Sequence, residues 1–219
     1  MHAPSEIAQT LAEFGRFDAY TLGDSARRAG TGGVLSQFKP QTADSVFVGR
    51  ALTARICHEQ HRSIPLKDYG GAELRERVGP GDVIVLDGGG LMLSAMGELA
   101  FANLVGRGAA GAVVNACVRD VEQMEKLQLG LPVFALGAAI PTVAGSARII
   151  DVGGTIYISG VRIATGDLIA GCRGGIVVLP WQDREAVLAE ARAITESDRL
   201  VREGLQRGES ITQLWQRHK

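Results

Sequence analysis

Apolar residues recur at helical spacing at both ends of the chain. Residues 5–14 predict an amphipathic helix with Ser5 as its cap, and residues 23–29 predict a second, shorter helix. The tail from 183 to about 204 predicts a long amphipathic helix, because its apolar positions follow the same period. The expected packing positions of that tail helix are Val187, Leu188, Ala191, Ile194 and Val201.

The middle of the chain changes to strand-like patterning. Residues 83–86 form a near-continuous apolar run, which is typical of a strand buried on both faces. A glycine-rich stretch, 87–90, follows and is expected to be a loop. A helix over about 97–107 and a second buried strand over 112–114 complete a strand–helix–strand unit. Such a unit nearly always pairs its strands in parallel, with a right-handed crossover.

Several shorter elements surround this unit, and glycine-rich turns separate them. No linker and no internal repeat interrupts the pattern. The whole chain, 1–219, is therefore predicted to form one α/β domain, with mixed sheets flanked by helices. Further strands are expected over 45–56, 132–135, 149–152, 155–159 and 176–179, and short helices over 73–78 and 121–129.

The composition narrows the class of protein. Hydrophobic residues make up 46% of the chain, which is enough for a sizeable core, and the 29 glycines are about twice the average usage. A formal net charge of −1 argues against a nucleic-acid binder with a broad basic surface. No run of about 18 apolar residues predicts a membrane span. Three widely spaced cysteines and an amino terminus unlike a secretory signal predict a cytoplasmic protein.

The candidate chemistry gathers at one edge of the predicted sheet. A ten-residue helix descends about 15 Å, and a strand of five or six residues climbs about 17–20 Å, so the two distances nearly cancel. Asp87 with its glycines, the helix start at Gly97-Glu98, and Arg119-Asp120 are therefore expected at the same carboxyl edge, where parallel sheets bind ligands. Adjacent strand residues point to opposite faces, so Arg119 and Asp120 can serve one site only if the backbone bends.

Each of these groups suits an anionic ligand or a divalent cation. N–H groups at a helix start favour anions, and Arg119 can grip a carboxylate through two parallel hydrogen bonds. Asp120 and Glu98 offer hard oxygen ligands for Mg²⁺ or Mn²⁺. The plain alternatives are a surface ion pair for Arg119-Asp120 and a helix-dipole role for Glu98.

Several segments, in this order and spacing, resemble the RraA-like family. The likeness is closest to its 4-hydroxy-4-methyl-2-oxoglutarate aldolase and oxaloacetate decarboxylase branch, and it covers most of the chain. The matching segments are GPGDVIVLDGGG (79–90), GELA (97–100), GAAGAVV (108–114) and VRD (118–120), with TLGDS (21–25), VGRALT (48–53), TGDL (165–168) and GGIVVLP (174–180).

The resemblance implies roles for particular residues. That branch carries an Asp, twenty residues, then Arg-Asp; Arg119 and Asp120 match, and Glu98 stands one carbon longer in the first position. By resemblance, Asp120 holds Mg²⁺ or Mn²⁺, and Arg119 and Glu98 are catalytic. Arg119 also contacts the substrate, and the backbone around Gly97, Glu98 and Leu99 binds its pyruvyl carboxylate.

The resemblance also implies a swivelling β/β/α fold, a homotrimer or hexamer, and active sites at subunit interfaces. A neighbouring subunit is expected to donate an acid from the C-terminal helix, with Glu196 as the candidate. The chain departs from the family pattern at Gly171-Cys172-Arg173 and at Asn115-Ala116-Cys117. These departures bear on the substrate more than on the reaction class.

The expected function is therefore a metal-dependent lyase acting on small 2-oxo acids. It would cleave 4-hydroxy-2-oxo acids to pyruvate and decarboxylate oxaloacetate through the same pyruvate enolate. The alternative is a non-enzymatic regulator that binds a ribonuclease or another protein through its oligomeric surface. Lys67 and Lys126 are interpreted as surface residues, and His58 with His61 as part of a solvated loop instead of a metal site.

Overall fold

One mixed sheet organises the computed structural model, which describes residues 3–43, 45–59 and 63–218. Its strand order is β1-β11-β10-β3-β4-β5-β6-β2, with β7 paired to β3, and β8 and β9 form a separate hairpin. The strands are β1 (Gly33–Leu35), β2 (Lys39–Pro40), β3 (Phe47–His58), β4 (Asp82–Met96), β5 (Gly111–Val118), β6 (Val133–Ala138), β7 (Ala147–Val152), β8 (Thr155–Ile158), β9 (Val161–Ala164), β10 (Leu168–Cys172) and β11 (Gly175–Leu179).

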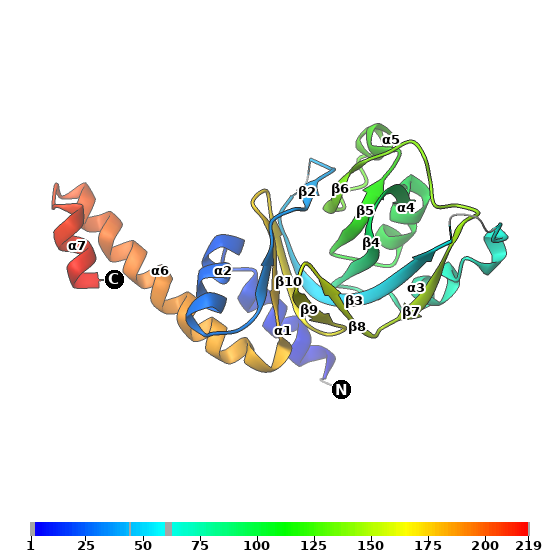
Figure 1. Cartoon of the computed structure of the whole chain (residues 1–219). Helices are drawn as coiled ribbons and strands as arrows, with labels where there is room; N and C mark the ends of the chain where they lie inside the picture. The colour runs from blue at the N-terminus through cyan, green and yellow to red at the C-terminus, as the bar shows by residue number, and fades with distance from the viewer. Residues whose placement is uncertain (1–2, 44, 60–62, 219) are drawn as a thin grey trace.

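Helices cover this sheet in two groups (Figure 1). One group surrounds the green strands β4 and β5, and the other packs near β10 and continues into an arm that ends at the C-terminus. None of the helices within the described ranges is long and apolar enough to cross a membrane. The helices are α1 (Pro4–Phe14), α2 (Ala19–Arg28), α3 (Gly71–Arg77), α4 (Glu98–Gly106), α5 (Val121–Lys126), α6 (Arg184–Gln206) and α7 (Ile211–His218), with 3₁₀ turns at Leu66–Asp68 and Trp181–Asp183.

The predicted strand–helix–strand unit is confirmed as β4, α4 and β5. The two strands run in parallel, with Val83 opposite Gly111 and Leu86 opposite Val114. Alternate residues of β4 enter different hydrophobic clusters, so the strand is buried on both faces as its apolar run predicted. The mixed α/β fold with flanking helices is therefore confirmed.

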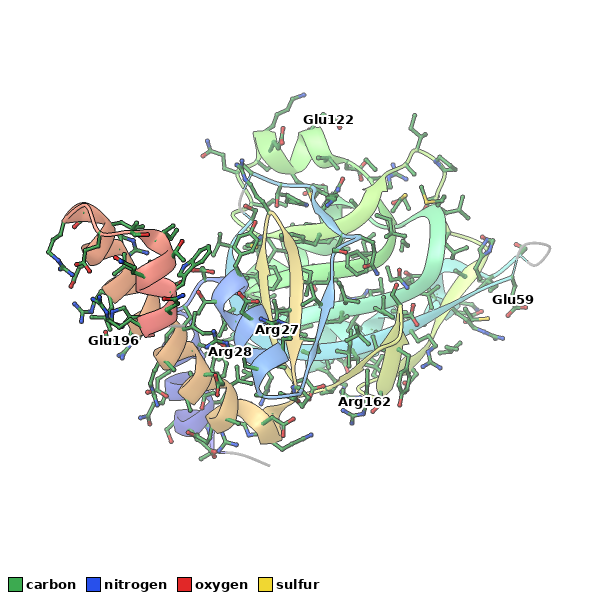
Figure 2. The ribbon with its side chains drawn as sticks, turned by 60° about the vertical axis from the view of Figure 1, so that its left-hand side comes forward. Arg27, Arg28, Glu59, Glu122, Arg162 and Glu196 are labelled. Carbon is green, nitrogen blue, oxygen red and sulfur yellow. The ribbon has the colours of Figure 1, made fainter. Side chains whose placement is uncertain are left out.

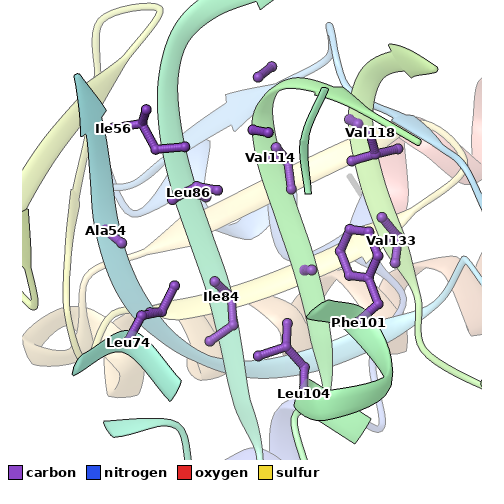
Figure 3. Packing of buried hydrophobic residues seen from close by; sticks show 14 of the residues in the cluster. Ala54, Ile56, Leu74, Ile84, Leu86, Phe101, Leu104, Val114, Val118 and Val133 are labelled. Carbon is purple, nitrogen blue, oxygen red and sulfur yellow. The ribbon is translucent and has the colours of Figure 1, made fainter. Parts of the chain in front are cut away.

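The largest cluster lies between α4 and the sheet (Figure 3). Phe101 and Leu104 project from α4 onto strand residues such as Ile84 and Val114, and all four are at most 2% exposed. A separate cluster joins α1, α2 and α6 to β10 and β11. The first cluster fixes the position of the α4 amino terminus at the end of β4.

The glycine-rich stretch after residue 86 is not a loop, so that prediction was wrong. Strand β4 continues through it to Met96, and its register against β5 shifts between Asp87 and Leu91. Gly89 and Gly90 take positive φ values of 65° and 79°, which glycine adopts without steric cost and which let the strand bulge. Asp87 consequently pairs with Asn115, four residues before Arg119. It does not lie at the carboxyl edge of the sheet, where it was predicted.

The helix boundaries also correct two predictions. Ser5 is not a cap: α1 begins at Pro4, whose fixed φ suits the first helical position. Helix α2 begins at Ala19 instead of residue 23, because the Asp18 side chain accepts from Thr21 N at 2.8 Å and caps it there. The long tail helix is confirmed as α6, with all five expected packing positions buried. Strands β1, β2, β9 and β10 and helix α7 were not predicted.

The position of α4 depends on Phe101, which is fully buried. Phe101→Ala removes that ring from a close-packed cluster, so we expect the free energy of unfolding to fall by about 3–5 kcal/mol. The measurement is denaturant unfolding, and the matched control is Val105→Ala on the same helix, where the side chain is 39% exposed. Equal losses for the two variants would contradict this description of the α4 interface.

Candidate active site

The backbone turns sharply where β5 meets α5. Asp120 has φ 62° and ψ 30°, a left-handed conformation that few residues other than glycine adopt, although aspartate tolerates it. The bend lets neighbouring side chains meet, and Arg119 Nε donates to Asp120 Oδ1 at 3.1 Å. The sequence analysis required such a bend for the two residues to serve one site, and the structure contains it.

Gly97 brings a second segment against this turn. The main chain of Met96 accepts from Arg119 N at 3.0 Å, so the end of β4 lies beside the pair. A Cβ atom at residue 97 would lie 2.6 Å from Asp120 Oδ2 and 3.0 Å from Arg119 Cγ. A side chain at residue 97 would therefore have to displace the Asp120 carboxylate and the Arg119 side chain. The structure brings Gly97, Arg119 and Asp120 together as predicted.

The amino terminus of α4 carries unused hydrogen-bond donors. Gly97 O accepts from Ala100 N and Phe101 N, but no side chain caps the helix. Within the described residues, nothing accepts from the N–H groups of Glu98 and Leu99. The Leu99 side chain is 82% exposed. These N–H groups and the helix dipole form a site for an anion next to Arg119.

Two carboxylates remain available at this edge. Asp120 is 37% exposed and uses only Oδ1, while Glu98 is half-buried and makes no ion pair with any described residue. A cavity of about 290 Å³ adjoins the pair, lined by Arg119, Asp120 and the first turn of α5 with Glu122, and by residues 138–140. Figure 2 shows Glu122 on α5 at the outer edge of the sheet.

The carboxylate oxygens available at this edge are ligands that suit Mg²⁺ or Mn²⁺. Across residues 3–43, 45–59 and 63–218, no three His, Cys, Asp or Glu side chains gather closely enough to hold a metal. One or two carboxylates suit Mg²⁺ or Mn²⁺, which keep water and substrate oxygens in their shell, and Asp120 with Glu98 meets that need. His61 lies outside the described residues.

Asp87 does not join this site, although the sequence analysis placed it there. Its Oδ1 accepts from Asn115 Nδ2 at 2.8 Å and from Gly89 N at 2.9 Å, and Arg55 Nε lies 4.0 Å from Oδ2. The carboxylate is therefore committed to the bulge of β4. Its position could not be predicted because it depends on the strand register.

Glu196 lies on the arm formed by α6 and α7, well apart from Glu122 (Figure 2). Arg199 donates to both of its carboxylate oxygens, at 2.7 and 2.8 Å, and this hydrogen bonding lowers the Glu196 pKa. Within one chain Glu196 is not part of the site. Its contribution as an acid to the site of a neighbouring subunit stays a prediction.

The departure from the family pattern at Gly171-Cys172-Arg173 lies next to Tyr20. A hydrogen bond with Cys172 raises the pKa of the Tyr20 hydroxyl.

A second cavity, of about 380 Å³, lies beside α4. It is lined by Met96 and Leu99, by α3 and by Tyr69. The Tyr69 hydroxyl donates to Ala95 O at 3.2 Å, and burial raises its pKa to about 12. This cavity could not be predicted from the sequence, because its walls come from four separate segments and residues 58–71 carry no clear pattern.

Residues 18–178 match the family model described as RraA-like, aldolase/RraA. The chain belongs to the RraA-like family. An uncharacterised protein from Methanocaldococcus jannaschii is 30% identical over 178 residues, which cover 81% of this chain and 82% of that one. A protein from Acinetobacter baylyi, provisionally named a 4-hydroxy-4-methyl-2-oxoglutarate aldolase, is 32% identical over 64% of this chain and 77% of its own.

Solved structures of RraA-like proteins share the fold. A Streptomyces coelicolor protein, described as an unusual member of the RNase ES inhibitor family, has a TM-score of 0.77 at 21% identity and covers 89% of this chain and 96% of that one. The RNA-processing inhibitor from Thermus thermophilus has a TM-score of 0.58 at 26% identity and covers 72% and 90%. RraA-like relatives therefore include both named aldolases and named inhibitors.

The raised pKa of the buried Tyr69 hydroxyl predicts that the protein loses stability at high pH. Its pKa is raised from about 10 to about 12, so the stability gained by burying the neutral phenol is present below pH 10 and is lost as the pH approaches 12. We expect a tyrosinate absorbance titration to contain a step near pH 12 that Tyr69→Phe removes. Tyr157→Phe, at a residue 64% exposed, should leave that step in place. A step unchanged by Tyr69→Phe would contradict the assignment.

Proposed function

We propose that this RraA-like protein is a divalent-metal-dependent lyase that releases pyruvate from small 2-oxo acids. Its reactions are retro-aldol cleavage of 4-hydroxy-2-oxo acids, such as 4-hydroxy-4-methyl-2-oxoglutarate, and decarboxylation of oxaloacetate. The observation that carries the proposal is the uncapped start of α4 lying against the Arg119–Asp120 turn. The provisional name of the Acinetobacter baylyi relative supports the reaction class.

Substrate binding begins with the carboxylate of the 2-oxo acid. The free N–H groups of Glu98 and Leu99 bind it at the positive end of the α4 dipole. Arg119 gives only Nε to Asp120, so its two terminal amino groups remain for the substrate. The pyruvyl end is thereby oriented toward Asp120.

Asp120 would hold the metal, and Glu98 at the start of α4 is the second acid that the sequence offers for it. Oδ2 makes no hydrogen bond with the described residues and lies beside Gly97, at the mouth of the site. A bound Mg²⁺ or Mn²⁺ supplies Lewis acidity to the substrate carbonyl.

The chain's own residues handle charge and protons. In the retro-aldol reaction, Glu98 takes the proton of the C4 hydroxyl, the C3–C4 bond breaks, and its electron pair forms the pyruvate enolate while C4 becomes a carbonyl. Arg119 stabilises the negative oxygen of that enolate. Protonation at C3 then gives pyruvate. With oxaloacetate, the departing group is CO₂ and no hydroxyl proton has to be removed.

The assembly proposed by resemblance is a homotrimer or a hexamer of trimers. Such an assembly would let Glu196 of a neighbouring subunit approach the site. The rival function is a non-enzymatic regulator that binds a ribonuclease or another protein, as the inhibitor relatives suggest. Pyruvate release from oxaloacetate by the wild-type protein separates the two, because a regulator needs no turnover with Mg²⁺ or Mn²⁺.

Asp120→Asn tests the metal role. The amide keeps the shape of the side chain but loses its charge, so we expect metal-dependent oxaloacetate decarboxylation to fall to background while the protein stays folded. A coupled assay of pyruvate release over a Mg²⁺ titration measures this. Glu122→Gln is the matched control, since it removes a neighbouring exposed carboxylate of the same cavity and should keep its activity. Near-wild-type turnover by Asp120→Asn would refute the role.

Arg119→Ala tests the stabilisation of the enolate. Loss of the guanidinium should lower kcat/KM by about 10²–10³, the range for removing one group that stabilises transition-state charge. Arg119→Lys keeps a positive charge but cannot form two parallel hydrogen bonds, so its kcat/KM should lie between those of the wild type and Arg119→Ala. Steady-state kinetics with oxaloacetate gives both values, and Lys126→Ala on α5 is the control. Unchanged kinetics in Arg119→Ala would overturn the assignment.

A further inference from the structure

The cavity beside α4 adjoins the backbone groups assigned to the proposed site, although it shares no lining residue with the cavity next to Arg119 and Asp120. Met96 and Leu99 line it. Met96 also accepts the N–H of Arg119 through its carbonyl oxygen, and Leu99 carries one of the free N–H groups. A ligand whose carboxylate binds the Leu99 N–H is therefore next to a residue that lines the cavity.

The inner wall of this cavity is apolar. Leu74, Leu86 and Leu104 line it and are at most 5% exposed, and Ile149 of β7 closes the far side. The Tyr69 hydroxyl is already bonded to Ala95 O and is kept neutral by burial, so it offers no charge. A carboxylate placed against this wall would lose its hydration without gaining a partner there.

The polar groups of the cavity lie at its rim. Arg75 and Asn103 are exposed residues on α3 and α4. The Arg75 side chain makes no ion pair with any described residue and lies over Gly71, where a Cβ would be 2.8 Å from Nη1. This rim cation is the one feature that could attract a second carboxylate, so the test below includes a dicarboxylic substrate.

We infer that the cavity receives an apolar substituent on C4 of the substrate. The inference rests on the proposed function and deepens it: the preferred substrates are 4-hydroxy-2-oxo acids that carry an alkyl or aryl group on C4 in place of a carboxylate. The 2-oxo acid end binds at Glu98, Leu99 and Arg119, while the apolar end fills the space between α3, α4 and β7.

A chain-length series measures the preference. We expect kcat/KM for retro-aldol cleavage to rise about fourfold for each methylene as the C4 substituent grows from methyl to propyl, the factor given by burying one methylene group. The propyl compound should also exceed 4-hydroxy-2-oxoglutarate, which has a carboxylate at that position. A flat series, or a preference for the dicarboxylic compound, would overturn the inference.

Ile149→Trp fills part of the cavity from its β7 wall. This variant should reduce the ratio of kcat/KM for the propyl compound to that for the methyl compound at least tenfold. It should leave oxaloacetate decarboxylation unchanged, and that activity also serves as the check that the variant is folded. Ile150→Trp is the matched control, because the neighbouring residue of β7 is 52% exposed and does not line the cavity. Ile149→Phe replaces the first variant if oxaloacetate turnover is lost. An undiminished propyl advantage in a folded Ile149 variant contradicts the inference.

Binding of unreactive 2-oxo acids distinguishes this inference from the proposed function. Calorimetry with Mg²⁺ compares pyruvate, 2-oxopentanoate and 2-oxohexanoate, and tighter binding of the longer acids is expected even if no turnover occurs. Oxaloacetate turnover without any chain-length effect removes the cavity inference and keeps the lyase. Chain-length-dependent binding without turnover removes the lyase and keeps the ligand class. Failure of both measurements removes both.

Discussion

The approach of the α4 amino terminus to the Arg119–Asp120 turn is the contact on which the site depends. The absence of a side chain at residue 97 leaves room for this approach, since a Cβ there would lie 2.6 Å from Asp120 Oδ2 and would displace that carboxylate. The parallel pairing of β4 with β5 brings the two segments to the same edge, and the buried Phe101 holds α4 in place. Free N–H groups, a guanidinium and a carboxylate therefore meet without any of them being part of the hydrophobic core.

Stability does not account for the geometry of that turn. An exposed ion pair contributes about 0–1 kcal/mol, and the Arg119–Asp120 pair is 47% and 37% exposed. A residue other than glycine in the left-handed region costs of the order of 1–3 kcal/mol. The turn is thus at best neutral for folding, and backbone strain of this kind occurs at functional sites. The geometry is better explained by what it offers to a ligand than by what it contributes to the fold.

Local patterns predicted those parts of the structure that depend on neighbours in sequence. The apolar run 83–86 identified a strand buried on both faces, and the spacing in α6 identified all five of its packing positions. The glycines after Asp87 were misread because a loop and a bulged strand need the same left-handed residues, and only pairing with β5 decides between them. The cavity near Tyr69 was invisible for the same reason, since its walls meet only after α3 and β7 have packed.

The hydrogen bonds of the Asp87 carboxylate determine which other acids are available at the edge of the sheet. The family-pattern departure at Asn115 supplies the amide that binds Asp87 Oδ1, and Gly89 N occupies the same oxygen. Arg55 lies near the other oxygen, so this carboxylate stabilises the bulge and is not available to a ligand. Asp120 remains beside Arg119, with Glu98 at the start of α4 and the exposed Glu122 on α5 at the same edge. The proposed metal ligand and the proposed base therefore have to come from these acids and not from Asp87.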